Sequence, residues 1–128
     1  MHIITVAEMR RLDAAAMTAG VSGAELMLNA GTGAAAQILR FVERYPVRHR
    51  QSYTVLAGKG NNGGDAWVVA ATLAAQGHAV RLCSTCPIEQ LPEAARHHAA
   101  KLPAAVPVIQ FDDSHCALPE PCLAPGAI

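Results

Sequence analysis

A short apolar segment that runs directly into a glycine-rich turn most constrains the fold of this chain. Residues 52–57 are mostly apolar or β-branched, which is typical of a strand buried on both faces. The turn at 58–65 leads into an alanine-rich helical pattern, and segments of the two kinds alternate after it. In chain order we expect a strand at 52–57, a helix at 66–76, a strand at 79–83, a helix at 88–102 and a strand at 106–111. This alternation predicts an α/β fold with a parallel sheet and right-handed connections.

Two helices are expected before the first strand. Residues 5–8 (Thr-Val-Ala-Glu) and 22–25 (Ser-Gly-Ala-Glu) have the form of capping boxes, in which a hydroxyl and a carboxylate bind free amides at a helix start. The first helix should run from about Val6 to Ala19. The second should run from the second box to about Tyr45, because Pro46 cannot continue a helix. The apolar face of the first helix should hold Met9, Leu12, Ala16 and Met17.

The chain is expected to form a single domain over residues 1–128. Gly31 and Gly33 in the second helix permit close approach of either a packed neighbour or a ligand, and composition favours packing against the sheet. Residues 112–128 hold three prolines, two cysteines and no hydrophobic periodicity, so we expect an irregular tail there.

Charge and hydropathy exclude several classes of function. Lys and Arg number 10 and Asp and Glu number 10, so no basic excess exists to neutralise a nucleic-acid backbone or an anionic membrane surface. The apolar runs are too short to span a membrane. The start, Met1-His2-Ile3-Ile4-Thr5, lacks the basic and apolar regions of a secretory signal. We therefore expect a cytoplasmic protein that binds neither nucleic acid nor membrane.

The glycine-rich turn formally matches a dinucleotide-binding fingerprint. Gly58, Gly60 and Gly63 have the required spacing and lie between a strand and a helix. The second strand, however, ends at Cys83-Ser84, where an ordinary NAD site carries an acidic residue for the ribose. The turn also lacks the Lys and Ser/Thr of a phosphate-binding P-loop.

Polar side chains in the same turn suggest a different ligand. Asn61, Asn62 and Asp65 offer oxygen atoms that suit a hard cation or sugar hydroxyls. The plain alternative is a strand-to-helix turn in which Asp65 caps the helix and the Asn and Gly residues adopt positive φ. The density of such residues favours a ligand site.

Residues 55–70 resemble the signature of the YjeF N-terminal domain family, the NAD(P)H-hydrate epimerases. Residues 25–31 (Glu-Leu-Met-Leu-Asn-Ala-Gly) are similar to a second family element, and the likeness covers about Met9 to Leu82. The resemblance implies a Rossmann-like three-layer α/β/α sandwich with a parallel sheet, preceded by two helices. It also implies an isomerase that interconverts the R and S epimers of the damaged hydrates NADHX and NADPHX, so that a partner dehydratase can act on one epimer.

The resemblance implies the site residues as well. In the family the Asn-Asn-Gly-Gly-Asp segment lines the NAD(P)HX site, which carries over to Asn61, Asn62, Gly63, Gly64 and Asp65. Its second Asn, here Asn62, helps to bind a potassium ion. The family's Val-Asp-Ala-Leu-x-Gly-Thr-Gly element, which carries the catalytic Asp, and its Asp-Ile-Pro-Ser-Gly element are absent from the 128 residues. We therefore transfer no catalytic role to Asp112 or Asp113, and we expect a partial domain that lacks the C-terminal part of its sheet and whose activity is lost through truncation.

Two further classes of function stay open. A three-stranded sheet leaves apolar surface uncovered, so the chain could be a non-catalytic nucleotide-binding or self-association module, for example a homodimer. Cys83 and Cys86 form a CxxC that could act as a redox dithiol. Zinc could be bound by Cys83 and Cys86 with Cys116 and either Cys122 or His115. Free thiols without a role are favoured over both.

Overall fold

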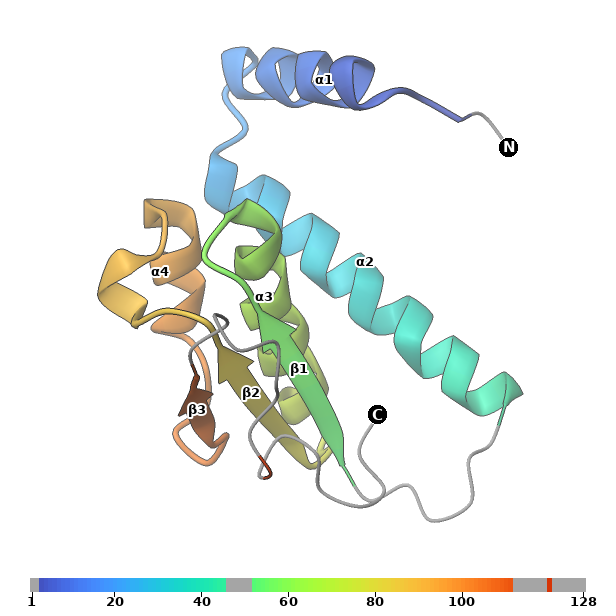
Figure 1. Ribbon diagram of the computed structural model, residues 1–128. Helices are drawn as coiled ribbons and strands as arrows, with labels where there is room; N and C mark the ends of the chain where they lie inside the picture. Colours follow the sequence, from blue (N-terminus) through green and yellow to red (C-terminus); the bar gives the residue numbers. More distant parts are fainter. Residues whose placement is uncertain (1–2, 46–51, 112–119, 121–128) are drawn as a thin grey trace.

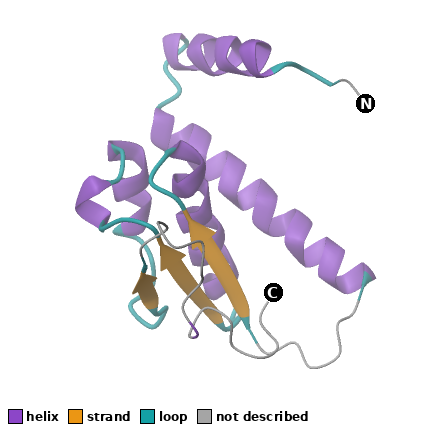
Figure 2. Ribbon diagram, viewed as in Figure 1, coloured by secondary structure: helices purple, strands orange, loops and turns teal. Residues whose placement is uncertain are grey.

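Figure 1 shows a computed structural model of the protein, in which residues 3–45, 52–111 and 120 are described. Helices α1 (Val6–Thr18) and α2 (Gly23–Arg44) precede a parallel sheet of strands β1 (Tyr53–Ala57), β2 (Val80–Ser84) and β3 (Val108–Gln110). Helix α3 (Asn61–Ala75) connects β1 to β2, and the 3₁₀ helix η1 (Ile88–Gln90) and helix α4 (Glu93–Ala99) connect β2 to β3 (Figure 2). The predicted α/β fold with a parallel sheet is confirmed.

The strands lie in the order β1-β2-β3, and because both pairs are parallel, their carboxyl ends lie at the same end of the sheet. Tyr53 pairs with Val80 and Leu82 pairs with Val108. Tyr53, Val80 and Leu82 belong to the core, whereas Val108 is 44% exposed; because side chains alternate along a strand, Leu56 points to the face opposite Tyr53 and is half-exposed. Helix α3 packs on β1 and β2, and α2 and α4 pack on α3. Within the described residues, no helix covers the opposite face of the sheet. Of the predicted α/β/α sandwich, these residues therefore form the sheet and one helical layer.

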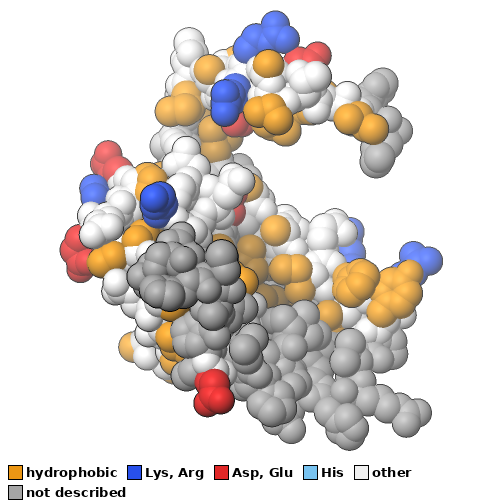
Figure 3. Space-filling view, viewed as in Figure 1, with side chains coloured by type: hydrophobic (Ala, Val, Ile, Leu, Met, Phe, Trp, Pro, Cys, Tyr) orange, Lys and Arg blue, Asp and Glu red, His pale blue; other side chains and the backbone are white. Residues whose placement is uncertain are grey.

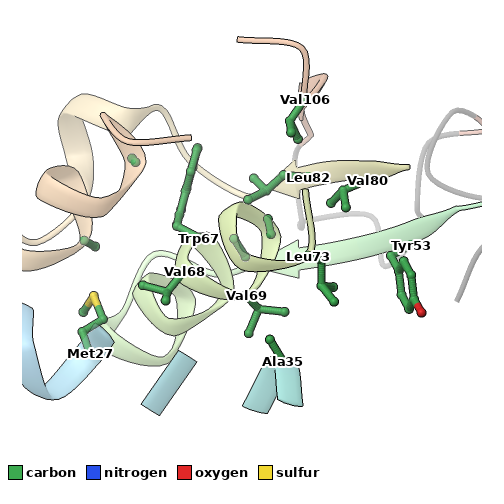
Figure 4. Close-up of a cluster of buried hydrophobic side chains, with 14 of the residues drawn as sticks. Met27, Ala35, Tyr53, Trp67, Val68, Val69, Leu73, Val80, Leu82 and Val106 are labelled. Atoms are coloured by element: carbon green, nitrogen blue, oxygen red, sulfur yellow. The ribbon is translucent and has the colours of Figure 1, made fainter. Parts of the chain in front are cut away.

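Helix α3 occupies the centre of the core. Trp67 and Leu73 are fully buried, and Leu82 of β2 is buried beside them (Figure 4). Alanines and valines fill much of the rest of the helix, because α3 is enclosed by the sheet, α2 and α4. Gly77 follows the end of α3 and has a φ of 84°, a left-handed backbone conformation that residues with a side chain rarely adopt. The chain turns there out of the helix.

Two predicted helix boundaries are wrong. Helix α3 begins at Asn61 and not at Ala66, so the predicted turn is mostly helical. The single helix expected at 88–102 is divided into η1 and α4, because Pro92 has an extended ψ of 153° and lacks the amide that a helix interior requires.

Helix α1 follows its local signals but packs differently from the expectation. The Thr5 N–H donates to the Glu8 carboxylate at 2.7 Å, and the Glu8 N–H donates to the Thr5 hydroxyl at 3.2 Å, which completes the predicted capping box. No residue of α1 is buried, and hydrophobic side chains show on its surface in Figure 3. Its expected apolar face is therefore exposed: Met9, Leu12 and Met17 are 47%, 57% and 56% accessible. Homodimerisation, expected from uncovered apolar surface, stays a prediction.

Helices α2 and α3 approach each other closely at Gly31. Gly31 is buried, and a Cβ atom there would overlap Val68 and lie 2.9 Å from the Asp65 carbonyl oxygen. Gly33, two residues later on α2, faces open space, and a Cβ atom there would meet nothing within 4 Å. The expectation of close packing therefore holds for Gly31, where the neighbour is α3 rather than the sheet, and not for Gly33.

The two glycines form a matched pair for mutation. We expect Gly31→Ala to lower the free energy of unfolding by about 1–3 kcal/mol, because α2 and α3 must move apart to admit the methyl group. Gly33→Ala should raise it by about 0.5–1 kcal/mol, because alanine is the better helix former at an exposed site. Chemical denaturation of both variants measures this, and equal effects would contradict the close contact at Gly31.

Candidate functional site

The site begins at the first turn of α3. Gly60 precedes the helix, and no side chain caps it. The Gly64 N–H donates to the Gly60 carbonyl at 3.2 Å, so the amides of Asn61, Asn62 and Gly63 have no acceptor within the helix. The plain alternative, in which Asp65 caps the helix, is thus wrong, because Asp65 lies beyond the first turn. The free amides make this helix end favourable for negatively charged groups.

A cavity of about 410 Å³ opens beside this turn and is bounded by all four α-helices. It contains three of the five predicted site residues, Asn61, Asn62 and Asp65. The remaining lining comes from Asp13 and Met17 of α1, Gly23, Leu26, Met27 and Ala30 of α2, and Ala94 of α4. The structure therefore brings the polar residues of the turn together against an apolar wall.

Gly63 and Gly64 lie behind the cavity lining and not in it. Both are buried. A Cβ atom on Gly63 would overlap the Gly58 carbonyl oxygen, and one on Gly64 would lie 2.5 Å from Met27 Sδ and 2.9 Å from Ala95 Cβ. Their role in the structure is to let the first turn of α3 pack against the preceding loop, α2 and α4. Gly58 and Gly60 of the formal fingerprint meet no such limit, since a Cβ on either has nothing within 4 Å.

The cavity places one carboxyl in a partly desolvated position. Burial raises the pKa of the Asp65 carboxyl above its usual value, and the nearby His98 lowers that pKa by a smaller amount. A raised pKa in a cavity is typical of groups that bind ligands or transfer protons.

The oxygen-bearing side chains at the cavity fit a hard monovalent cation. Asn61 and Asn62 are exposed at the helix start and can present carbonyl oxygens, and Asp13 and Asp65 add carboxylates. Asn62, the residue that the family resemblance assigns to potassium, is among them. In the described part of the chain, no group of three or more His, Cys, Asp or Glu side chains is placed to hold a metal ion.

The cysteines depart from the sequence expectation. Cys83 is disulfide-bonded, so the prediction of free thiols is wrong for it and right for Cys86, which is buried and free. Cysteine density and compartment guided that prediction, whereas pairing depends on which side chains the fold brings together. Because Cys86 is free, the two do not pair with each other as a redox dithiol. The zinc alternative also uses Cys116, Cys122 and His115, which lie outside the described residues.

Sequence reasoning missed the lining residues that come from α1 and α2. Asp13 had a detectable signal, because it lies four residues after Met9 and four before Met17, and thus on the apolar face of α1. Leu26 and Met27 stand in the second family element at 25–31, but apolar helix residues are ordinarily part of a core, so their chemistry alone did not indicate a cavity wall.

Comparison with known proteins connects this site to a family. The family model described as YjeF-related protein N-terminus matches residues 23–125. The NAD(P)H-hydrate epimerase of Rhodobacter capsulatus is 39% identical over 104 residues, which are 74% of this chain and 46% of that protein. The bifunctional NAD(P)H-hydrate repair enzyme Nnr of Coxiella burnetii is 34% identical over 122 residues, 94% of this chain and 22% of that protein. The chain thus spans less than half the length of these relatives.

A solved structure shows the same fold. The crystal structure of the yeast protein ynu0, YNL200c, superposes with a TM-score of 0.71 at 24% identity, over 91% of this chain and 50% of that chain. Independently of these likenesses, no helix in the described part of the chain has the length and apolar character needed to cross a membrane. The expected cytoplasmic location stays a prediction.

The raised pKa of Asp65 predicts a dependence of stability on pH. The folded chain binds more protons than the unfolded chain between the carboxyl's usual pKa, 3.8, and its raised value, so the free energy of unfolding falls as pH rises through that window. Asp65→Asn removes this loss, and we expect the variant to be more stable than the wild type at pH 7, with the difference shrinking below about pH 4. Urea denaturation from pH 3.5 to 7 measures it. Asn62→Ala, which changes the same cavity without removing a titratable group, is the control and should keep the shape of the wild-type profile; parallel profiles for wild type and Asp65→Asn would contradict the interpretation.

Proposed function

Because the chain belongs to the YjeF-related N-terminal family, we propose that its cavity binds NADHX and NADPHX, the hydrates of NADH and NADPH. One observation carries the proposal: Asn61, Asn62 and Asp65, which the family resemblance implicates, line a single cavity at the start of α3. The family's activity is the epimerisation of these hydrates, a step in repair of nicotinamide nucleotides.

The cavity offers complementary groups to such a ligand. The free amides of the first turn of α3 favour phosphate oxygens. The carboxamides of Asn61 and Asn62 can both donate and accept hydrogen bonds, as ribose hydroxyls and a nicotinamide carboxamide require. Leu26 and Met27 provide an apolar wall for a ring.

Epimerisation at a carbinolamine carbon requires proton transfer, because the hydroxyl leaves as water and returns to the other face. Asp13 and Asp65 are the carboxyls at the cavity, and neither corresponds to the family's catalytic Asp, whose motif these 128 residues do not contain. We therefore propose that this chain retains the substrate cradle without turnover. When bound, a potassium ion at Asn62 would supply positive charge beside the ligand. A dehydratase acting on one epimer is the partner that this function requires, as the bifunctional names of relatives suggest.

Binding can be tested on the chain as it stands. We expect Asn62→Ala to weaken binding of NADPHX in KCl about fivefold to tenfold, through loss of one hydrogen bond and of the cation. Replacement of KCl by N-methylglucamine chloride should weaken wild-type binding and leave Asn62→Ala unchanged. Isothermal titration calorimetry measures both effects. Gln76→Ala, which removes an amide at the far end of α3, is the matched control, and equal affinities of the two variants would contradict the site.

Catalysis is tested separately. Proton NMR of a mixture enriched in one NADPHX epimer should show no acceleration of epimer exchange by the chain, at concentrations where binding is saturated. Exchange at the rate of a full-length epimerase would overturn this expectation. Loss of that exchange in Asp65→Asn would then identify the carboxyl responsible, whereas its retention would direct attention to Asp112 and Asp113, which lie outside the described residues.

A further inference from the structure

A buried histidine connects two walls of the cavity. His98 of α4 is 4% exposed, and its Nε2 lies 2.7 Å from the carbonyl oxygen of Ala24. Because a carbonyl oxygen only accepts hydrogen bonds, Nε2 carries the proton and donates it. The bond joins residues that are 74 positions apart in the sequence. It therefore ties α4 to the first turn of α2.

The N-terminal part of α2, from Gly23 to Ala30, lines the cavity. Ala24 is next to Gly23 and close to Leu26 and Met27, all three of which line the cavity, although Ala24 itself does not. On its other side, this turn is held through the Ser22 hydroxyl, which accepts from the Glu25 N–H at 3.1 Å. That contact lies within α2, so it shapes the turn but does not fix where the turn sits relative to α3.

Helices α2, α3 and α4 meet directly behind the cavity. Met27 of α2 and Ala95 of α4 both press on Gly64 of α3, where no space remains for a methyl group. His98 also interacts electrostatically with Asp65 of α3. A displacement of the α2 turn from α4 would thus alter the separation between the apolar wall and the polar wall of the cavity.

We propose that His98 is a positioning residue: its hydrogen bond to the Ala24 carbonyl sets the separation between the first turn of α2 and the first turn of α3, and so the shape of the ligand cavity. The role of this hydrogen bond in placing the first turn of α2 is argued from the structure alone. Its consequence for NADPHX binding rests on the proposed function.

Two polar substitutions of similar size separate the hydrogen bond from general packing. In His98→Gln the side-chain amide nitrogen can occupy the position of Nε2 and keep the donor, whereas in His98→Asn it is too short to reach Ala24. His97→Asn changes the adjacent, exposed histidine and is the control. Hydrogen exchange measured by mass spectrometry reports the opening of residues 23–28 and, for comparison, of residues 34–44 in the same helix.

We expect His98→Asn to accelerate exchange about fivefold in the first turns of α2 and to leave the end of that helix unchanged, as loss of one hydrogen bond predicts. His98→Gln and His97→Asn should stay within about twofold of the wild type. Equal exchange in the Asn and Gln variants at position 98, or acceleration along the whole helix, would overturn the proposal. If His98→Asn does not fold, His98→Gln decides alone: wild-type protection supports the proposal, and lost protection of the first turns overturns it.

A binding measurement separates this inference from the proposed function. The dissociation constant for NADPHX should rise about fivefold in His98→Asn and stay within about twofold in His98→Gln. If exchange changes as expected while no variant, nor the wild type, binds NADPHX, the proposed function fails and the positioning role stands. If the wild type binds and both variants at position 98 bind equally well, the positioning role fails.

Discussion

The close approach of α2, α3 and α4 is the constraint on which the site depends. Gly31 lets α2 touch Val68 and the Asp65 carbonyl, and Gly64 lets α3 touch Met27 and Ala95. Gly63 does the same toward the loop that leaves β1. Because Gly31 and Gly64 carry no side chain at these contacts, the neighbouring helices approach closely and together line one cavity. Close packing at glycines thus brings the helices together behind the cavity, and the His98–Ala24 hydrogen bond joins the start of α2 to α4 within that packing.

Sequence reasoning succeeded where structure is set locally and failed where distant parts decide. The Thr5 capping box and the stop before Pro46 were predictable, because each depends on neighbouring residues. The start of α3 was not, because Asn and Gly favour loops by propensity, whereas the observed helix start packs Gly64 against Met27 and Ala95, which are distant in the sequence. The break at Pro92 follows from local chemistry, because proline lacks the amide that a helix interior requires.

The candidate site divides in the same way. Asn61, Asn62 and Asp65 stand together in the sequence, so a local motif could indicate them, although it could not show that they line a cavity. The apolar wall from α2 could not be told from ordinary core. His97 and His98 are adjacent and of one type, yet one is exposed and the other buried. They differ because α4 packs against α2 on the side of His98. No local sequence pattern indicates that contact.

The strand order has a consequence for how this sheet can be extended. In the described residues β1 lies at an edge, and the chain leaves its carboxyl end directly into the first turn of α3. The connections from β1 to β2 and from β2 to β3 advance in one direction, away from that edge. A parallel strand added beside β1 would reverse this direction and make the end of β1 a topological switch point, where open α/β sheets form their ligand crevices. The Asn-Asn-Gly-Gly-Asp segment follows this end of β1 and would line one side of such a crevice.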